Sequence, residues 1–128
     1  MLERIQKHVL GPHNPLAKGL GYKVVRITQN PAGTRVLQFM CCQNRTGYVM
    51  QQGVWLKAIN RTLDKFDCKI KYVSGFHIFV DPMNVKNIPS WMKDCGANGV
   101  VRVRWRQGRI LGAKDGRKII VADRMFVM

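Results

Sequence analysis

Residues 99–105 (GVVRVRW) alternate apolar and cationic side chains, and this pattern limits the fold of the chain more than any other. Alternation with a period of two is typical of a β-strand with one face in the core, because successive side chains point to opposite faces. Arg102, Arg104 and Arg106 then share one face. Guanidinium groups so placed repel one another unless an anion lies against them, and each can bind phosphate through two parallel hydrogen bonds.

Further segments are rich in β-branched and aromatic residues, and the sequence predicts strands there as well. They are residues 22–28, 48–59 with a turn at 51–53, 68–73, 76–80, 119–121 and 125–128. Residues 107–109 and the polar loop 114–118 are expected to be turns.

Helical spacing of apolar residues occurs in residues 1–10 and 34–43, and the sequence predicts a helix in each. The first has Leu2, Ile5, Val9 and Leu10, and the second has Val36, Leu37, Met40 and Cys41. A short turn or helix is expected at 90–95. This order of elements predicts an α+β fold with two small subdomains. We expect residues 1–74 to form a helix-strand-helix-strand unit and residues 75–128 to form a β-rich unit, whose cationic strand makes it the candidate RNA-binding subdomain.

The charge of the chain indicates its partner. There are 22 Lys and Arg against 7 Asp and Glu, a net charge of +15 that the few acids cannot balance. Nucleic acid is the usual polyanion for such a surface, because each neutralised phosphate releases a condensed counterion. Anionic membrane is the alternative, but it favours an amphipathic helix or a lipid anchor. No apolar run approaches the roughly 20 residues of a membrane span.

Three groups of residues are candidates for RNA contact. The first surrounds the arginine strand, where Trp105 either stacks on a base or lies in the core. The second is the basic loop near Gly116, which is otherwise a solvated turn. The third is the segment from Thr28 to Arg35, near the expected start of the second helix. Backbone N–H groups there could bind a phosphate, or Thr34 could simply cap the helix. The candidates are Thr28, Gln29, Asn30, Arg35, Arg102, Arg104, Trp105, Arg106, Gln107, Gly108, Arg109, Lys114, Arg117 and Lys118.

Catalytic and metal-binding patterns are absent from the sequence, so no catalytic residue, metal, cofactor or small-molecule substrate is expected. His8, His13 and His77 are far apart in the sequence. The four cysteines form no C-x-x-C and are expected to be reduced thiols, as in a reducing compartment. Two alternatives remain: a small basic ribonuclease using His77 with a nearby Lys or Asp, and a free regulatory RNA-binding module.

Several short segments match one protein family in the same order along the chain. Residues 1–11 (MLERIQKHVLG) and 22–31 (YKVVRITQNP) are similar to its first helix and to its first strand with the following loop. Residues 34–49 (TRVLQFMCCQNRTGYV) are similar to its second helix, which ends in Gly-Tyr-Ile. In the second half, Ile88-Pro89 and residues 99–104 match an Ile-Pro and a strand. On these matches the chain resembles the eighth protein of the small ribosomal subunit.

This resemblance implies a structural constituent of the small ribosomal subunit that binds ribosomal RNA beside neighbouring ribosomal proteins. Where the family has a Ser/Thr-rich turn, this chain has Arg104, Trp105 and Arg106, so contact through charge and stacking is implied. The family's late Gly-Gly-Glu is replaced by Val121-Ala122-Asp123. Such divergence in a very basic chain suggests by analogy a ribosome of the mitochondrial matrix, with a cytoplasmic or plastid ribosome as the alternative.

Overall fold

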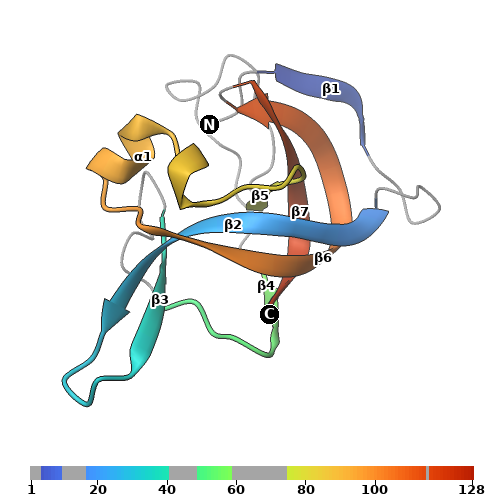
Figure 1. Cartoon of the computed structure of the whole chain (residues 1–128). Helices are drawn as coiled ribbons and strands as arrows, with labels where there is room; N and C mark the ends of the chain where they lie inside the picture. The colour runs from blue at the N-terminus through green and yellow to red at the C-terminus, as the bar shows by residue number, and fades with distance from the viewer. Residues whose placement is uncertain (1–3, 10–16, 41–48, 59–74, 115) are drawn as a thin grey trace.

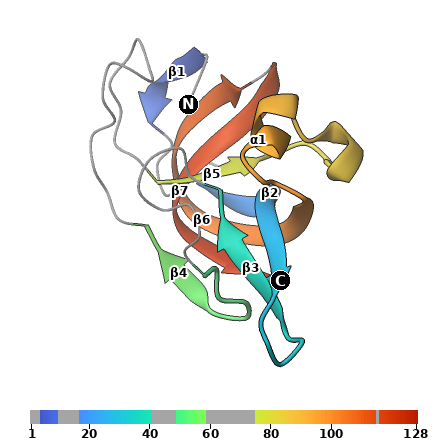
Figure 2. The same ribbon diagram turned by 90° about the vertical axis from the view of Figure 1, so that its left-hand side faces the viewer.

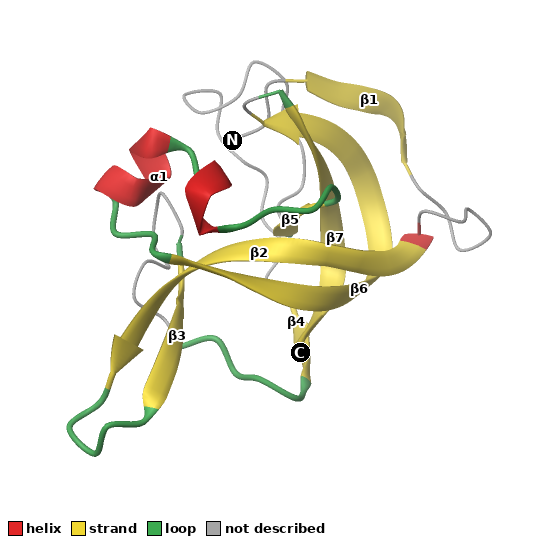
Figure 3. Ribbon diagram, in the orientation of Figure 1, coloured by secondary structure: helices red, strands yellow, loops and turns green. Residues whose placement is uncertain are grey.

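The computed structural model describes residues 4–9, 17–40, 49–58, 75–114 and 116–128. In this part of the chain, strands form one antiparallel sheet that curls around a core (Figure 1). The strands are β1 (Arg4–Val9), β2 (Lys18–Gln29), β3 (Arg35–Phe39), β4 (Trp55–Lys57), β5 (Phe76–Phe79), β6 (Gly99–Lys114) and β7 (Arg117–Val127). The longer helical elements are the 3-10 turn η2 (Val85–Asn87) and the short helix α1 (Ser90–Asp94), drawn in red in Figure 3. A short red segment just before β2 corresponds to Ala17.

Four strands of the sheet close on themselves. The sheet order is β1-β6-β2-β5-β7-β4, and β6 also pairs with β7, so β6, β2, β5 and β7 form a ring. β2 pairs with β6 from Lys18↔Arg106 to Val25↔Gly99, whereas β2 meets β5 only at Tyr22↔Phe79. Because these strands are paired on both sides, the ring leaves them little unpaired edge. β3 and β4 extend the sheet beyond the ring (Figure 2).

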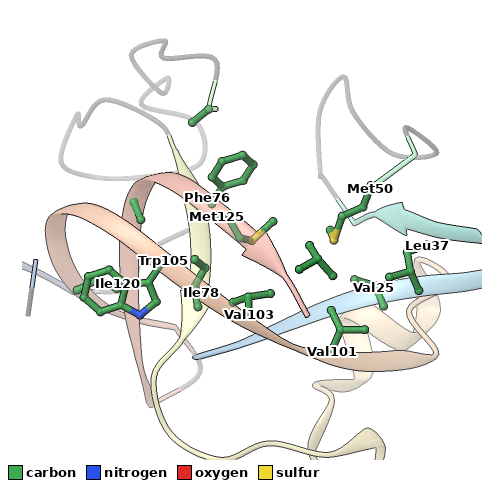
Figure 4. Close-up of a cluster of buried hydrophobic side chains, with 13 residues drawn as sticks. Val25, Leu37, Met50, Phe76, Ile78, Val101, Val103, Trp105, Ile120 and Met125 are labelled. Atoms are coloured by element: carbon green, nitrogen blue, oxygen red, sulfur yellow. The ribbon is translucent and has the colours of Figure 1, made fainter. Parts of the chain in front are cut away.

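The interior of the ring is the main hydrophobic core (Figure 4). Alternate residues of β6 supply Val101, Val103 and Trp105, which are at most 6% exposed. Ile78 of β5 and Ile120 of β7 are fully buried against them. The alternation of apolar and polar residues therefore places one face of each strand in this core.

A second core lies on the opposite side of β5 and β7. Phe79 follows Ile78 in β5, and Val121 follows Ile120 in β7, yet these following residues pack into a separate cluster. The connection between β5 and β6 covers that cluster with Met83, Ile88, Met92 and Ala97. Asn84 caps η2, because its side chain accepts a hydrogen bond from the Lys86 N–H at 2.9 Å. The connection containing α1 thus packs against the outside of the ring of strands, which forms a small barrel (Figure 2).

Glycine at position 21 allows β2 to approach β5. A Cβ atom there would overlap the Ile78 side chain and lie 2.8 Å from the carbonyl oxygen of Phe79. Ordinary Cβ contacts do not come so close to backbone. The narrow contact that closes the ring therefore depends on Gly21.

Strand β6 bends where the sequence predicts a turn. Gln107 has a positive φ of 56°, and the register with β7 shifts between Gly108 and Ile110. A bulge of this kind bends a strand and increases its twist, as a small closed sheet requires. The prediction of a turn at residues 107–109 is therefore wrong, because β6 continues through these residues to Lys114.

The predicted α+β fold is also wrong, because strands occupy both of the expected N-terminal helices. β1 pairs with β6 at Arg4↔Ala113, and β3 pairs with β2 from Val25↔Phe39 to Gln29↔Arg35. Helical spacing in a short apolar segment does not separate a helix from a strand. Here pairing with distant or neighbouring strands supplies the backbone hydrogen bonds instead.

The other expected elements agree better with the structure. Strands predicted at residues 22–28, 76–80 and 99–105 are present, although β5 ends at Phe79. Those predicted at 119–121 and 125–128 merge into one strand, β7, which ends at Val127. Among the described residues 49–58, Trp55–Lys57 is a strand and Val49 forms an isolated bridge with Gln38. The short turn or helix expected at 90–95 is the helix α1. The strand expected at 68–73 lies outside the described residues. Strands from both sides of the expected boundary near Gly75 share one sheet.

Candidate nucleic-acid interface

The outer face of β6 carries the arginines that the sequence singled out. Arg102, Arg104 and Arg106 are exposed, while Val103 and Trp105 between them are buried in the barrel. The alternation therefore places all three guanidinium groups on one side of the strand, outside the core.

Sheet register extends this cationic face across four neighbouring strands. Lys18 of β2 lies opposite Arg106 of β6. Arg106 also lies opposite Arg124 of β7, which in turn lies opposite Lys57 of β4. Paired residues of neighbouring strands point to the same face. We call Lys18, Arg106, Arg124 and Lys57 the cation row; it crosses three inter-strand gaps, or about 14 Å.

A second row runs parallel to the first, two residues along each strand. Leu20 lies opposite Arg104, Arg104 opposite Phe126, and Phe126 opposite Trp55. We call Leu20, Arg104, Phe126 and Trp55 the aromatic row. The rings of Trp55 and Phe126 are tilted against each other, with centroids 5.5 Å apart. Both rings are half-buried, and Leu20 is 53% exposed.

One arginine links the two rows. The guanidinium carbon of Arg106 lies 4.2 Å from the centroid of the Trp55 ring, which is a cation–π contact. The contact holds a planar cation over a planar ring. The face therefore combines positive charge with flat surfaces at the same point.

Carboxylates lie outside both rows. In the part of the chain that the structure describes, the acids are Asp81, Asp94 and Asp123. Asp81 and Asp94 belong to the β5–β6 connection, and Asp123 precedes Arg124 in β7. The two rows are thus cationic or apolar at every position.

Trp105 does not contribute to this face. Its side chain is 3% exposed, and its indole N–H donates to the carbonyl oxygen of Leu20 at 3.3 Å. A Cβ atom at Gly19 would lie only 3.0 Å from the indole, so the ring fills the space above that glycine. The predicted stacking of Trp105 on a base is therefore wrong, and the alternative of a core tryptophan is right.

The polar residues before Arg35 form a hairpin tip rather than a helix start. The Asn30 side chain accepts a hydrogen bond from the Thr34 N–H at 2.9 Å, and the Asn30 N–H donates to the Thr34 carbonyl oxygen at 2.9 Å. Gln29 pairs with Arg35 in the β2–β3 hairpin, and both are exposed. Thr28 is half-buried in β2. The predicted phosphate site at a helix start is thus absent, and the hairpin projects from the barrel (Figures 1 and 2).

The basic loop near Gly116 is the turn between β6 and β7. Lys114 pairs with Arg117, and Gly116 takes the positive φ of 72° that the tight turn needs. Lys118 is exposed and Arg117 half-buried, whereas the side chains of Lys114 and Arg109 are not described. Eight residues of β6 separate Arg106 from this turn, about 26 Å along the strand.

The three predicted groups therefore do not form one surface. Of the other candidates, Gln107 is exposed at the bend of β6, and Gly108 is buried opposite Ala122. The structure instead joins the arginine strand to residues that sequence reasoning missed. These are Lys18, Leu20, Trp55, Lys57, Arg124 and Phe126. Strand register alone brings them together, and no local pattern in the sequence encodes it.

His77, the residue that a ribonuclease would use, lies in β5. Lys23 donates from Nζ to the carbonyl oxygen of His77 at 2.8 Å, and the His77 Nδ1 lies 3.2 Å from the Gly75 carbonyl oxygen. Cys95 is a free, exposed thiol, and the other cysteines lie outside the described residues. Within the described ranges, no three His, Cys, Asp or Glu residues gather as metal ligands. Nor does any helix there have the length and apolarity to cross a membrane.

Comparison with protein-family models, with characterised proteins and with solved structures found no match. The function is therefore inferred from the two rows themselves. The resemblance to the ribosomal family gains nothing from the fold, because its first two helices correspond to β1 and β3 here.

Proposed function

We propose that this chain is an RNA-binding protein that holds RNA phosphates on the cation row. The observation that carries the proposal is the line of Lys18, Arg106, Arg124 and Lys57 across four adjacent strands. Lys and Arg contacts to phosphates release condensed counterions, which supplies most of the sequence-independent affinity for a nucleic acid.

The cation row is unfavourable for the protein alone. Like charges directly opposite each other on neighbouring strands destabilise a sheet. Here that arrangement repeats across each gap of the row, where strands are about 4.8 Å apart. A polyanion lying along the row removes this repulsion, because it places negative charge against each cation in turn.

The sequence extends this proposal to a specific assembly. A structural role in the small ribosomal subunit, in mitochondria, is the finer proposal that the resemblance suggests. Sedimentation of a cell extract tests it, because a ribosomal component migrates with the small subunit. Migration of the protein away from the ribosome favours the free RNA-binding module instead.

The experiment for RNA binding is a salt titration of affinity. In Arg106→Gln combined with Arg124→Gln, two phosphate contacts are removed. The plot of log affinity against log salt concentration becomes shallower by about 1.4 for a single strand. The matched control is Lys86→Gln combined with Lys93→Gln, which removes the same charge from exposed positions in η2 and α1. The control keeps the slope of the unmodified protein.

Equal slopes for the two double variants would overturn the proposal, because the effect would then depend on net charge and not on the row. Circular dichroism of both variants checks that the sheet is intact. All four substituted residues are exposed or half-buried.

A further inference from the structure

The chemistry of the aromatic row indicates which kind of RNA binds to the face that carries the two rows. We infer that it binds a single strand with unpaired bases, which crosses β2, β6, β7 and β4 with its phosphates on the cation row and its bases on the aromatic row. The inference rests on the proposed function and adds to it the substrate class and the direction of the bound strand.

The spacing of the rows matches the two parts of a nucleotide. On every strand the two rows are two residues apart, about 6.7 Å. A nucleotide places its base on one side of the ribose and its phosphate on the other, so one nucleotide reaches from row to row. The direction across the strands follows because both rows run perpendicular to them.

Flat surfaces are present where bases would lie. Trp55 and Phe126 are half-buried, so their rings are held by the sheet while part of each remains accessible. Arg106 lies over Trp55 at 4.2 Å, which adds a guanidinium plane to the indole. Unpaired bases stack on aromatic rings and on guanidinium planes, and this is how most single-stranded RNA is held.

Duplex RNA does not use the aromatic row. Its bases are stacked inside the helix, and its deep, narrow major groove excludes side chains. A duplex would meet the cation row with its phosphates and leave Phe126 and Trp55 without a partner. The parallel arrangement of two chemically different rows therefore favours a strand that exposes both phosphates and bases.

An anionic membrane is less compatible with the face than a nucleic acid. Leu20 and Met128 are about half exposed, at 53% and 46%, but cations separate them on the sheet. Arg102 pairs with Tyr22, and Met128 donates its N–H to the Arg102 carbonyl oxygen at 3.1 Å. Insertion into acyl chains would bury these arginines together with the apolar side chains, at a high cost in desolvation.

The test compares variants of the aromatic row on two RNA probes. Trp55→Leu and Phe126→Leu each keep an apolar side chain but remove the ring. Affinity for a single-stranded RNA of about 12 nucleotides is expected to fall about tenfold in each, as for the loss of one stacked base. The salt slope stays unchanged, because no cation is removed. Trp91→Leu, an exposed tryptophan in α1 that is 37% accessible, is the control and keeps its affinity.

A hairpin RNA of equal charge, with its bases paired, is the second probe. The unmodified protein is expected to bind the hairpin more weakly than the single strand. Neither Trp55→Leu nor Phe126→Leu is expected to change the affinity for the hairpin. Equal affinity for both probes, with no effect of Trp55→Leu or Phe126→Leu, overturns this inference but leaves RNA binding in place. No binding of either probe overturns the proposed function as well. Binding to vesicles of phosphatidylserine and phosphatidylcholine, in place of RNA, identifies the face as a membrane surface and overturns both.

Discussion

Trp105→Phe separates the two roles that the sequence allows for this tryptophan, core packing and RNA contact. The substitution removes the indole N–H that donates to the Leu20 carbonyl oxygen at 3.3 Å, which costs about 0.5–1.5 kcal/mol. The smaller ring also gives up apolar contact worth about two methylene groups, near 1.6 kcal/mol. The free energy of unfolding is therefore expected to fall by about 2–3 kcal/mol, a large share of the 5–15 kcal/mol typical of a domain.

Urea denaturation followed by circular dichroism measures this loss. With a typical urea dependence of about 2 kcal/mol per molar, the midpoint moves down by roughly 1 M. RNA affinity and its salt slope, measured without urea, stay at the values of the unmodified protein. The reason is that Trp105 is 3% exposed and lies on the core side of β6.

A double-mutant cycle with Gly19 tests the packing directly. A Cβ atom at position 19 would lie 3.0 Å from the indole Cζ2, so Gly19→Ala alone forces that ring to shift and destabilises the protein. In the Trp105→Phe background the same methyl group enters the space that the indole vacates. The two effects are then non-additive by about 1 kcal/mol, with the double variant more stable than the sum predicts. Additive effects, or lower RNA affinity at unchanged stability in Trp105→Phe, would refute the placement of this ring.

Two further predictions concern the contacts that β2 makes with β5 and with the start of β6. Gly21→Ala places a methyl group against Ile78 and the Phe79 carbonyl oxygen, so we expect a loss of about 2 kcal/mol or more of unfolding free energy, measured by urea denaturation. A midpoint equal to that of the unmodified protein would show that β2 and β5 do not approach so closely. Asn98→Ala removes the side chain that accepts from the Ile27 N–H at 2.6 Å and donates to the Ile27 carbonyl oxygen at 3.0 Å, just before β6 begins. We expect a loss of about 1–2 kcal/mol by the same measurement, and no loss would mean that these two bonds are replaced by water.

Local alternation predicted the strands whose faces differ in polarity. In residues 101–105, Val101, Val103 and Trp105 enter the main core and the arginines between them face outward, so a period of two is visible in the sequence. In β3, by contrast, Val36, Leu37 and Phe39 are all at least partly buried, so alternation is lost and helical spacing appears instead. Its actual partner is β2, and the sequence alone does not show that the two pair.

The candidate site was predictable only within one strand. Arg102, Arg104 and Arg106 belong to one alternating segment, whereas Lys57 comes from a strand about fifty residues earlier in the sequence. A shift of one residue in the pairing of β4 with β7 would turn Trp55 and Lys57 away from the face. The cation row and the aromatic row therefore exist only through register, which closure of the ring and core packing determine.

RNA binding and the ribosomal assignment depend on different observations. The ribosomal assignment depends on an order of helices and strands, and the first two of those helices are β1 and β3 in the structure. RNA binding depends on a net charge of +15 and on four cations aligned across neighbouring strands. The alignment is a property of the folded sheet and needs no relative to support it. If the protein does not migrate with the small ribosomal subunit, the ribosomal proposal is therefore wrong. The proposal of RNA binding would still be tested separately, by the salt dependence of RNA affinity in variants of the cation row.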